Sequence, residues 1–111
     1  MRALLQQDVR ACCERHGIVV VAYGSFGCGH LFSHPTVEAA AASEGVPQSV
    51  ALLRWALKRG MCVIPKSVHA HRLQEVCPER VLADTLSDRA MQVLDTLQDG
   101  KKFCWDPSGI L

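Results

Sequence analysis

A lysine, a serine and an arginine follow a short apolar run in the stretch "VIPKSVHAHRLQE", residues 63–75. The run ends at Pro65, and Lys66, Ser67 and Arg72 come after it. If a helix begins just beyond Ser67, its free N–H groups and its dipole favour an anion there. The lysine offers a compact charge, the serine a hydroxyl, and the arginine a fork that fits phosphate oxygens. The stretch predicts a phosphate-binding site, although solvated charges at the start of a helix would give the same pattern.

Histidines form a second group of residues with possible chemistry, which in their case is metal binding. His69 and His71 form an H-x-H pair, and His30 and His34 lie near Cys28 in a glycine-rich loop. Positions i and i+2 of a helix do not face each other, so the pair does not favour a shared metal ion. His30, His34 and Cys28 lack an evident fourth ligand for a metal ion. We therefore predict no metal site.

The cysteines are scattered through apolar segments, and none sits in a C-x-x-C pair. Cys12 and Cys13 are adjacent, which is a strained arrangement for a disulfide. We expect free thiols that pack as small buried hydrophobic groups, in a reducing compartment such as the cytoplasm. The six cysteines are Cys12, Cys13, Cys28, Cys62, Cys77 and Cys104.

Length and composition limit the classes of function. A chain of 111 residues forms at most one domain, and its net charge of +1 offers no broad basic surface for nucleic acid. The longest apolar run, "IVVVAY", is too short to span a bilayer. The charged N-terminal stretch has no apolar core of the signal-peptide kind. We expect a globular protein without nucleic-acid or membrane partners.

Apolar periodicity and capping signals predict alternating helices and strands. Ser33 or His34 is the expected cap of the second helix, and Ser87 that of the last. Helices are expected over residues 4–16, 36–45, 46–60, 68–77 and 87–98, and strands over residues 18–23, 61–65 and, more weakly, 80–83.

This order defines an α/β fold with parallel strands and right-handed crossovers. Residues 18–23 are apolar on both faces, as in a buried parallel strand. Three parallel strands leave two open edges and cannot close a cylinder, which takes about eight strands. The chain is therefore expected to form part of a larger sheet.

Several motifs, in order along the chain, resemble the aldo-keto reductase family. "HGIVVVAYGSFG" resembles the family's sixth strand and its loop, usually Ala-Tyr-Ser-Pro-Leu-Gly, and "VIPKSVHAHRLQE" resembles the seventh strand and the cofactor-binding turn. "HPTVEAAAASEGVPQSVALLRWALKRG", "LSDRAMQVLDTL" and "KKFCWDP" resemble the intervening helical segment, the last helix and the tail. The resemblance covers residues 1–111. It implies the C-terminal part of a (β/α)8 TIM barrel, from helix five through strands six to eight to the C-terminal helix.

The resemblance implies that the anion is the 2′-phosphate of NADP(H). Lys66, Ser67, Val68 and Arg72 match the family's phosphate contacts, and Glu75 matches a position that contacts the adenine end. The next residue in this chain is a valine, where the family commonly has an asparagine, so one adenine hydrogen bond is in doubt.

The resemblance also implies contacts at the other end of the cofactor. Tyr23 matches the tyrosine that stacks on the nicotinamide ring. In the loop that straddles the pyrophosphate, Ser25, Phe26 and Gly27 are the expected contacts. Ser25 replaces the family's rigid proline, and Gly24 replaces a serine, which predicts a looser loop.

The family's catalytic tyrosine, lysine, aspartate and histidine come from its N-terminal half. This chain has a single tyrosine, Tyr23, which already matches the cofactor-stacking position. No general acid of the family type is then available, and hydride transfer to a carbonyl would leave an unneutralised alkoxide. We therefore assign no catalytic residue to this chain.

Three hypotheses remain open from the sequence. The chain is part of an NADP(H)-dependent aldo-keto reductase of a small carbonyl substrate, acting with a complementary N-terminal half-barrel. Alternatively, it binds NADP(H) without catalysis, alone or self-associated. The third hypothesis is a structural remnant without a ligand, which persists through association with itself or a relative because its strand edges are exposed.

Overall fold

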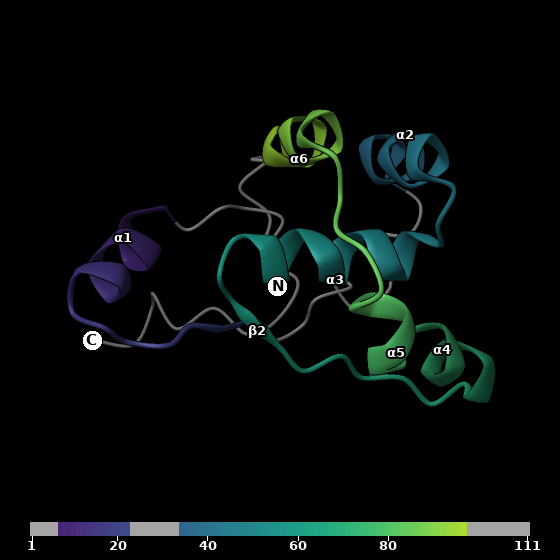
Figure 1. Ribbon diagram of the computed structural model, residues 1–111, viewed down its shortest axis with the longest axis horizontal. Helices are drawn as coiled ribbons and strands as arrows, with labels where there is room; N and C mark the ends of the chain where they lie inside the picture. Colours follow the sequence, from purple (N-terminus) through teal and green to yellow (C-terminus); the bar gives the residue numbers. More distant parts are fainter. Residues whose placement is uncertain (1–6, 23–33, 98–111) are drawn as a thin grey trace, which may run out of the picture.

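The computed structural model describes residues 7–22 and 34–97. Figure 1 shows helix α3 at the centre, with α2 and α6 on one side and α4 and α5 on the other. Helix α1 lies at the opposite end of the molecule from α4 (Figure 1). In chain order the elements are α1 (Gln7–Arg15), β1 (Val21–Ala22), α2 (Pro35–Glu44), α3 (Gln48–Lys58), β2 (Cys62–Val63), α4 (Ala70–Glu75), α5 (Pro78–Val81) and α6 (Asp88–Asp95).

The two strands form a parallel pair, which confirms the pairing expected from the alternation of strands and helices. Val21 lies opposite Cys62 and Ala22 opposite Val63. The Cys62 N–H donates to the carbonyl of Val20 at 2.8 Å, so the pairing extends one residue beyond β1. Helices α2 and α3 lie in the connection between the strands, as a parallel pair requires.

The prediction of a third strand over residues 80–83 is wrong, because this segment forms the end of α5 and a turn. Pro78 occupies the first turn of α5, where its missing N–H costs nothing. The Arg54 side chain then donates to the carbonyls of Val81 at 3.0 Å and Arg80 at 2.8 Å. These two carbonyls are therefore engaged by a guanidinium and not by a neighbouring strand.

Helix α2 begins and ends where the sequence predicts. Nδ1 of His34 accepts a hydrogen bond from the Thr36 N–H at 3.2 Å, and Pro35 occupies the first turn. Gly45 closes the helix with a φ of 65°, a left-handed conformation that glycine adopts at little cost.

Helix α3 supplies more buried hydrophobic residues than any other described element, which confirms the broad apolar stripe expected for residues 46–60. It packs against α2, β2, α4 and α5, while α6 packs on α2. The buried hydrophobic residues of α3 are Val50, Ala51, Leu52, Leu53, Trp55 and Ala56.

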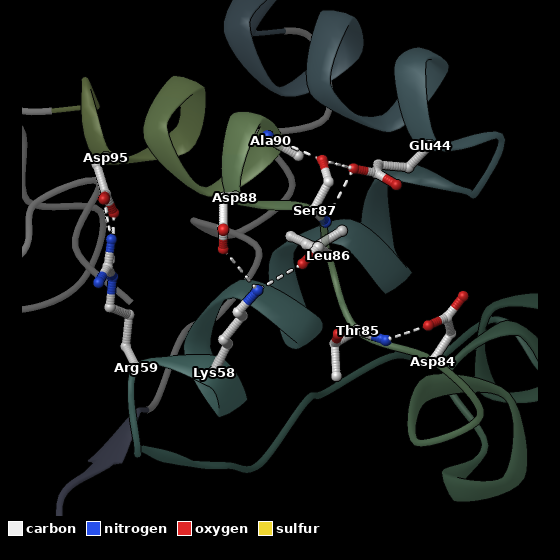
Figure 2. A network of polar contacts seen from close by, with 10 residues as sticks. All are labelled: Glu44, Lys58, Arg59, Asp84, Thr85, Leu86, Ser87, Asp88, Ala90 and Asp95. Carbon is white, nitrogen blue, oxygen red and sulfur yellow. Dashed lines mark hydrogen bonds and ion pairs between the residues drawn. The ribbon is translucent and has the colours of Figure 1, made fainter.

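The first turn of α6 is held by a polar network that Figure 2 shows. Ser87 is the predicted cap, and its Oγ accepts a hydrogen bond from the Ala90 N–H at 3.2 Å. The Ser87 N–H donates to Glu44 Oε1 at 3.0 Å, which ties α6 to α2. Lys58 Nζ reaches the carbonyl of Leu86 at 2.6 Å, which ties the same turn to α3.

Asp95 holds the other end of α6. Its Oδ1 accepts hydrogen bonds from Trp55 Nε1 at 2.8 Å and from Arg59 Nε at 3.2 Å. Arg59 also forms an ion pair with Asp95, drawn in Figure 2. Because Trp55 is buried, this carboxylate supplies the acceptor that its indole N–H needs.

Two expectations about burial are wrong. The strand segment around β1 is buried on one face only, because α3 covers one side of the sheet and no described element covers the other. The four cysteines among the described residues do not pack in the core: Cys12 and Cys62 are exposed, and Cys13 and Cys77 are half-buried. All four are free thiols, as predicted.

Candidate functional site

The carboxyl end of β2 leads into a short extended segment that carries the predicted phosphate-binding residues. Lys66 is exposed and Ser67 is half-buried. Ser67 Oγ accepts a hydrogen bond from the His69 N–H at 3.1 Å, which bends the backbone into α4. The serine is therefore fixed locally, and its hydroxyl also donates to the His69 carbonyl at 3.4 Å.

Helix α4 is shorter than the predicted 68–77, because it covers only Ala70–Glu75. Its cap, His69, makes no side-chain hydrogen bond to the helix. The macrodipole of so short a helix is small, so the charges of Lys66 and Arg72 carry most of the attraction for an anion.

Arg72 lies beside a cavity of about 470 Å³ between α4 and the α2–α3 connection. Glu75, one turn further along α4, also lines this cavity. Lys66, Ser67 and Val68 lie outside its lining. The structure thus brings Arg72 and Glu75 to one cavity and places Lys66 and Ser67 on the strand end that leads to it.

Ser49 is a residue of this cavity that sequence reasoning missed. It is 2% exposed, and its Oγ donates to Glu75 Oε2 at 3.0 Å. The hydrogen bond fixes one carboxylate oxygen and leaves Oε1 for another donor. The signal in the sequence was a lone serine within the otherwise apolar buried stripe of α3.

The cavity carries charges of both signs. Arg72 and His71 face it together with two carboxylates, Glu38 and Glu75. A phosphate group fits better beside Lys66 than deep in the cavity, because the carboxylates would repel it. A base with an amino group fits the carboxylates, which accept hydrogen bonds.

The valines of this segment differ in role. Val68 is 84% exposed and therefore takes no part in the core. Val76, at the position where an asparagine was noted as common, is partly buried and packs against the core. This chain therefore uses that position for packing.

The two histidines of the H-x-H motif approach each other more closely than expected. Their ring centroids lie 5.7 Å apart, because His69 precedes α4 and the i, i+2 helix argument does not apply to it. Within residues 7–22 and 34–97 there is no group of three metal-ligating side chains. The predicted contacts Tyr23, Ser25, Phe26 and Gly27 lie outside the described residues, as do His30 and Cys28.

A second cavity of about 520 Å³ lies at the amino ends of the two strands. Arg10 and Arg59 line it, and burial together with nearby Arg59 lowers the pKa of Arg10, while Glu14 acts in the opposite direction. Arg59 is paired with Asp95. One of the two arginines that line this cavity is therefore already engaged by a carboxylate.

The donor set at the carboxyl end of β2 fits a dinucleotide phosphate. An ammonium, a hydroxyl and a guanidinium can each donate to phosphate oxygens, and Glu75 can accept from a base.

No helix long and apolar enough to cross a membrane occurs in the described part of the chain. Parallel strands with a cation-rich carboxyl end define the class: an α/β protein with a phosphate-type ligand site at that edge.

Comparisons with known proteins narrow this class to a family. No protein-family model matches the chain. An aldo-keto reductase of Mycobacterium sp. (strain KMS) is 36% identical over 104 residues, which are 94% of this chain and 37% of that protein. An NAD(P)H-dependent pentose reductase of Pyricularia oryzae is 36% identical over 114 residues, with 90% of this chain and 34% of that protein covered.

A solved structure agrees with the sequence relatives. The crystal structure of a Gox0644 mutant in complex with NADPH superimposes with a TM-score of 0.83 at 28% identity, covering 96% of this chain and 39% of that one. The chain belongs to the aldo-keto reductase family. It spans little more than a third of the length of the relatives it matches, and it corresponds to part of their fold.

Proposed function

We propose that the chain forms the adenosine-phosphate part of an NADP(H) site in an aldo-keto reductase, and that it corresponds to the C-terminal part of the barrel. The observation that carries the proposal is that Lys66 follows the carboxyl end of a parallel strand in the chain, and that Arg72 and Glu75 of the next helix line one cavity. The active edge of such barrels is the carboxyl end of the strands.

The phosphate contacts follow from charge and position. Lys66 and Arg72 hold the 2′-phosphate, the first as a point charge and the second as a fork. Ser67 donates its hydroxyl to the same group, and the backbone at Val68 completes the contact. NADH lacks this phosphate, so these residues select NADP(H).

The adenine end is assigned to the cavity. Glu75, held by Ser49 at 3.0 Å, accepts from the exocyclic amino group of the base. In the same proposal Tyr23 stacks on the nicotinamide, and Ser25, Phe26 and Gly27 line the pyrophosphate.

The reaction of the assembled barrel is the reduction of a small carbonyl compound, for which NADPH supplies the hydride. The general acid comes from a segment outside these 111 residues, because the one tyrosine of the chain is assigned to the cofactor. The free thiols described above fit a reducing compartment such as the cytoplasm.

Calorimetric titration of the chain with NADPH and NADH tests the assignment. We expect NADPH to bind more tightly than NADH, and the double variant Lys66→Ala/Arg72→Ala to lose about 100-fold in NADPH affinity, since each contact to a charged group contributes about 1.5 kcal/mol or more. Arg89→Ala, an exposed arginine on α6, is the matched control and should bind as the parent does. Equal NADPH affinity of the double variant and the control would contradict the proposal.

The alternative function is NADPH binding without catalysis. It is based on the single tyrosine of the chain, Tyr23, which is assigned to the cofactor and so cannot also be the general acid. NADPH oxidation with an aldehyde, measured with and without the complementary part of a relative's barrel, separates the two functions. Turnover with the complement supports the reductase. NADPH binding without turnover in both samples supports a binding module.

A further inference from the structure

Two histidines lie between the two halves of the proposed phosphate-binding site. Lys66 and Ser67 lie on the segment that follows β2, whereas Arg72 lines the cavity beside α4. His69 is joined to the first half, because its N–H donates to Ser67 Oγ at 3.1 Å. His71 belongs to the second half, because it lines the same cavity as Arg72. The two histidines therefore connect the lysine and the serine with the arginine.

The side chains of His69 and His71 form a pair. Their ring centroids lie 5.7 Å apart, and the ring planes are tilted by 32°. Both residues are exposed, and the His69 side chain makes no hydrogen bond to the helix that it precedes. Neither ring is therefore used for the core or for capping α4.

Charges of both signs surround the histidine pair. In the cavity, Arg72 is accompanied by two carboxylates, Glu38 of α2 and Glu75 of α4. Apart from these residues and His71, the described residues that line the cavity carry no charge. Lys66 precedes the pair in the chain. Two cations are thus matched by two carboxylates, and a bound phosphate dianion would leave the surroundings of the imidazoles net negative.

Imidazole chemistry makes such a site sensitive to protons. Histidine is the side chain that changes its charge between about pH 8 and about pH 5. The neutral ring offers one N–H, whereas the protonated ring offers two together with a positive charge, which suits phosphate oxygens. Two imidazolium groups at 5.7 Å repel each other, and a neighbouring phosphate dianion offsets this repulsion. Phosphate binding should therefore be coupled to proton uptake.

We propose that His69 and His71 make the phosphate-binding site proton-linked, so that its selectivity for NADP(H) over NAD(H) rises as the pH falls from about 8 to about 6. The inference rests on the proposed function, which places the 2′-phosphate at Lys66 and Arg72. It adds a dependence on pH that lysine and arginine side chains do not ordinarily supply, because both stay protonated over this range. The H-x-H motif thereby gains a role other than metal binding.

Calorimetric titration of the whole chain with NADP⁺ and NAD⁺ at pH 8 and pH 6, at constant ionic strength, tests the proposal. We expect NADP⁺ to bind about fivefold more tightly at pH 6, the size expected for two exposed ion pairs, and NAD⁺ to change less. Titrations in two buffers with different ionisation enthalpies count the protons taken up. We expect more proton uptake with NADP⁺ than with NAD⁺.

Two double variants separate the charge of the pair from its shape. His69→Gln/His71→Gln keeps hydrogen-bonding side chains that do not titrate, and should remove both the gain at pH 6 and the extra proton uptake. His69→Lys/His71→Lys keeps the positive charge at both pH values, and should bind NADP⁺ at pH 8 at least as tightly as the parent does at pH 6. Circular dichroism checks that both variants keep the helical fold.

The control variant is His16→Gln. His16 is an exposed histidine just beyond α1, which lies at the opposite end of the molecule from α4 (Figure 1), and this variant should behave as the parent does. The 2′-phosphate itself gains a proton at about pH 6. This contribution is common to all the variants, so the difference between the parent and the glutamine variant isolates the two imidazoles.

The outcomes distinguish this inference from the proposed function. The same pH dependence in the parent and the glutamine variant would overturn the inference, and so would NADP⁺ binding without extra proton uptake. Either result leaves the cofactor assignment intact if NADP⁺ binds more tightly than NAD⁺ at both pH values. Equal affinities for the two cofactors at both pH values, or no binding of either, would contradict the proposed function and this inference with it.

Discussion

The helical cluster α2–α3–α6 and the β1–β2 sheet differ in where their partners lie. In the cluster, apolar residues are buried and polar groups meet within the chain, as Trp55 and Arg59 do at Asp95. In the sheet, two-residue strands pair with each other and leave Val19, Val21 and Ile64 exposed.

The difference follows from the nature of the two elements. A helix satisfies most of its backbone groups internally, so a few helices complete a core with only side-chain contacts. A strand satisfies its backbone groups through its neighbours, and its second face needs a second layer. In a chain that spans part of a barrel, the helices therefore find their packing partners within the chain, whereas the strands lack some of theirs.

The largest expected contrast comes from truncating one side chain in each region. Leu52→Ala in α3 should lower the free energy of unfolding by about 3 kcal/mol, because the side chain is fully buried and leaves a cavity. Ile64→Ala removes the same number of carbons from an exposed position just beyond β2 and should cost less than about 0.5 kcal/mol. Urea unfolding followed by circular dichroism measures both, and similar losses would refute the comparison.

Removing the carboxylate that joins α3 to α6 is expected to have the next largest effect. Asp95→Ala leaves the buried Trp55 N–H without its acceptor and should cost about 2 kcal/mol. Asp95→Asn keeps an acceptor oxygen and should recover part of the loss. Asp88→Ala, which removes an exposed pair with Lys58, is the control and should change the urea midpoint little. A midpoint for Asp95→Ala equal to that of Asp88→Ala would contradict the role of this contact.

The cap of α6 gives a smaller effect. Ser87→Ala removes the acceptor for the Ala90 N–H and the contact to Glu44, and should cost about 1 kcal/mol. Ser43→Ala is the matched control, because its hydroxyl bonds the Ala40 carbonyl within α2 and alanine is the better helix former. Thermal unfolding of the two variants should separate them, with only Ser87→Ala melting earlier. Equal melting temperatures would show that the cluster does not depend on this cap.

The smallest expected effect lies where the helical cluster meets the candidate site. Ser49→Ala frees the Glu75 carboxylate and should weaken NADPH binding about threefold, the equivalent of about 0.7 kcal/mol for one lost hydrogen bond. Ser49→Thr retains a hydroxyl and should bind more tightly than the alanine variant. An unchanged affinity in Ser49→Ala would mean that the hydrogen bond positions nothing the cofactor uses.

Much of the helical part of the fold could be predicted from local signals. His34 with Pro35 begins α2, Gly45 ends it, and Ser87 caps α6, each through contacts within four residues. The failures involve distant partners. The segment over residues 80–83 was expected as a strand, but Pro78 and the Arg54 side chain, far apart in sequence, hold it in a helical turn.

The candidate site shows the same difference between local signals and contacts that are distant in sequence. Lys66, Ser67 and Arg72 were predicted from their spacing after an apolar run; Lys66 and Ser67 follow β2 in the chain, and Arg72 lies in α4. Ser49 was missed because its role depends on a hydrogen bond to Glu75, which lies 26 residues away. The roles of these residues toward a cofactor stay predictions.

The sequence by itself determined which residues are apolar, where α2 begins and ends, where α6 begins, and which cations follow the second strand, because these properties depend on neighbours along the chain. Only the tertiary structure decided which face of the sheet is covered, that Asp95 serves Trp55, and that Arg72 and Glu75 share a cavity with Ser49. These depend on the packing of elements distant in sequence. A strand with apolar residues on both faces shows that two layers are needed, and only the packed fold shows that α3 provides one of them.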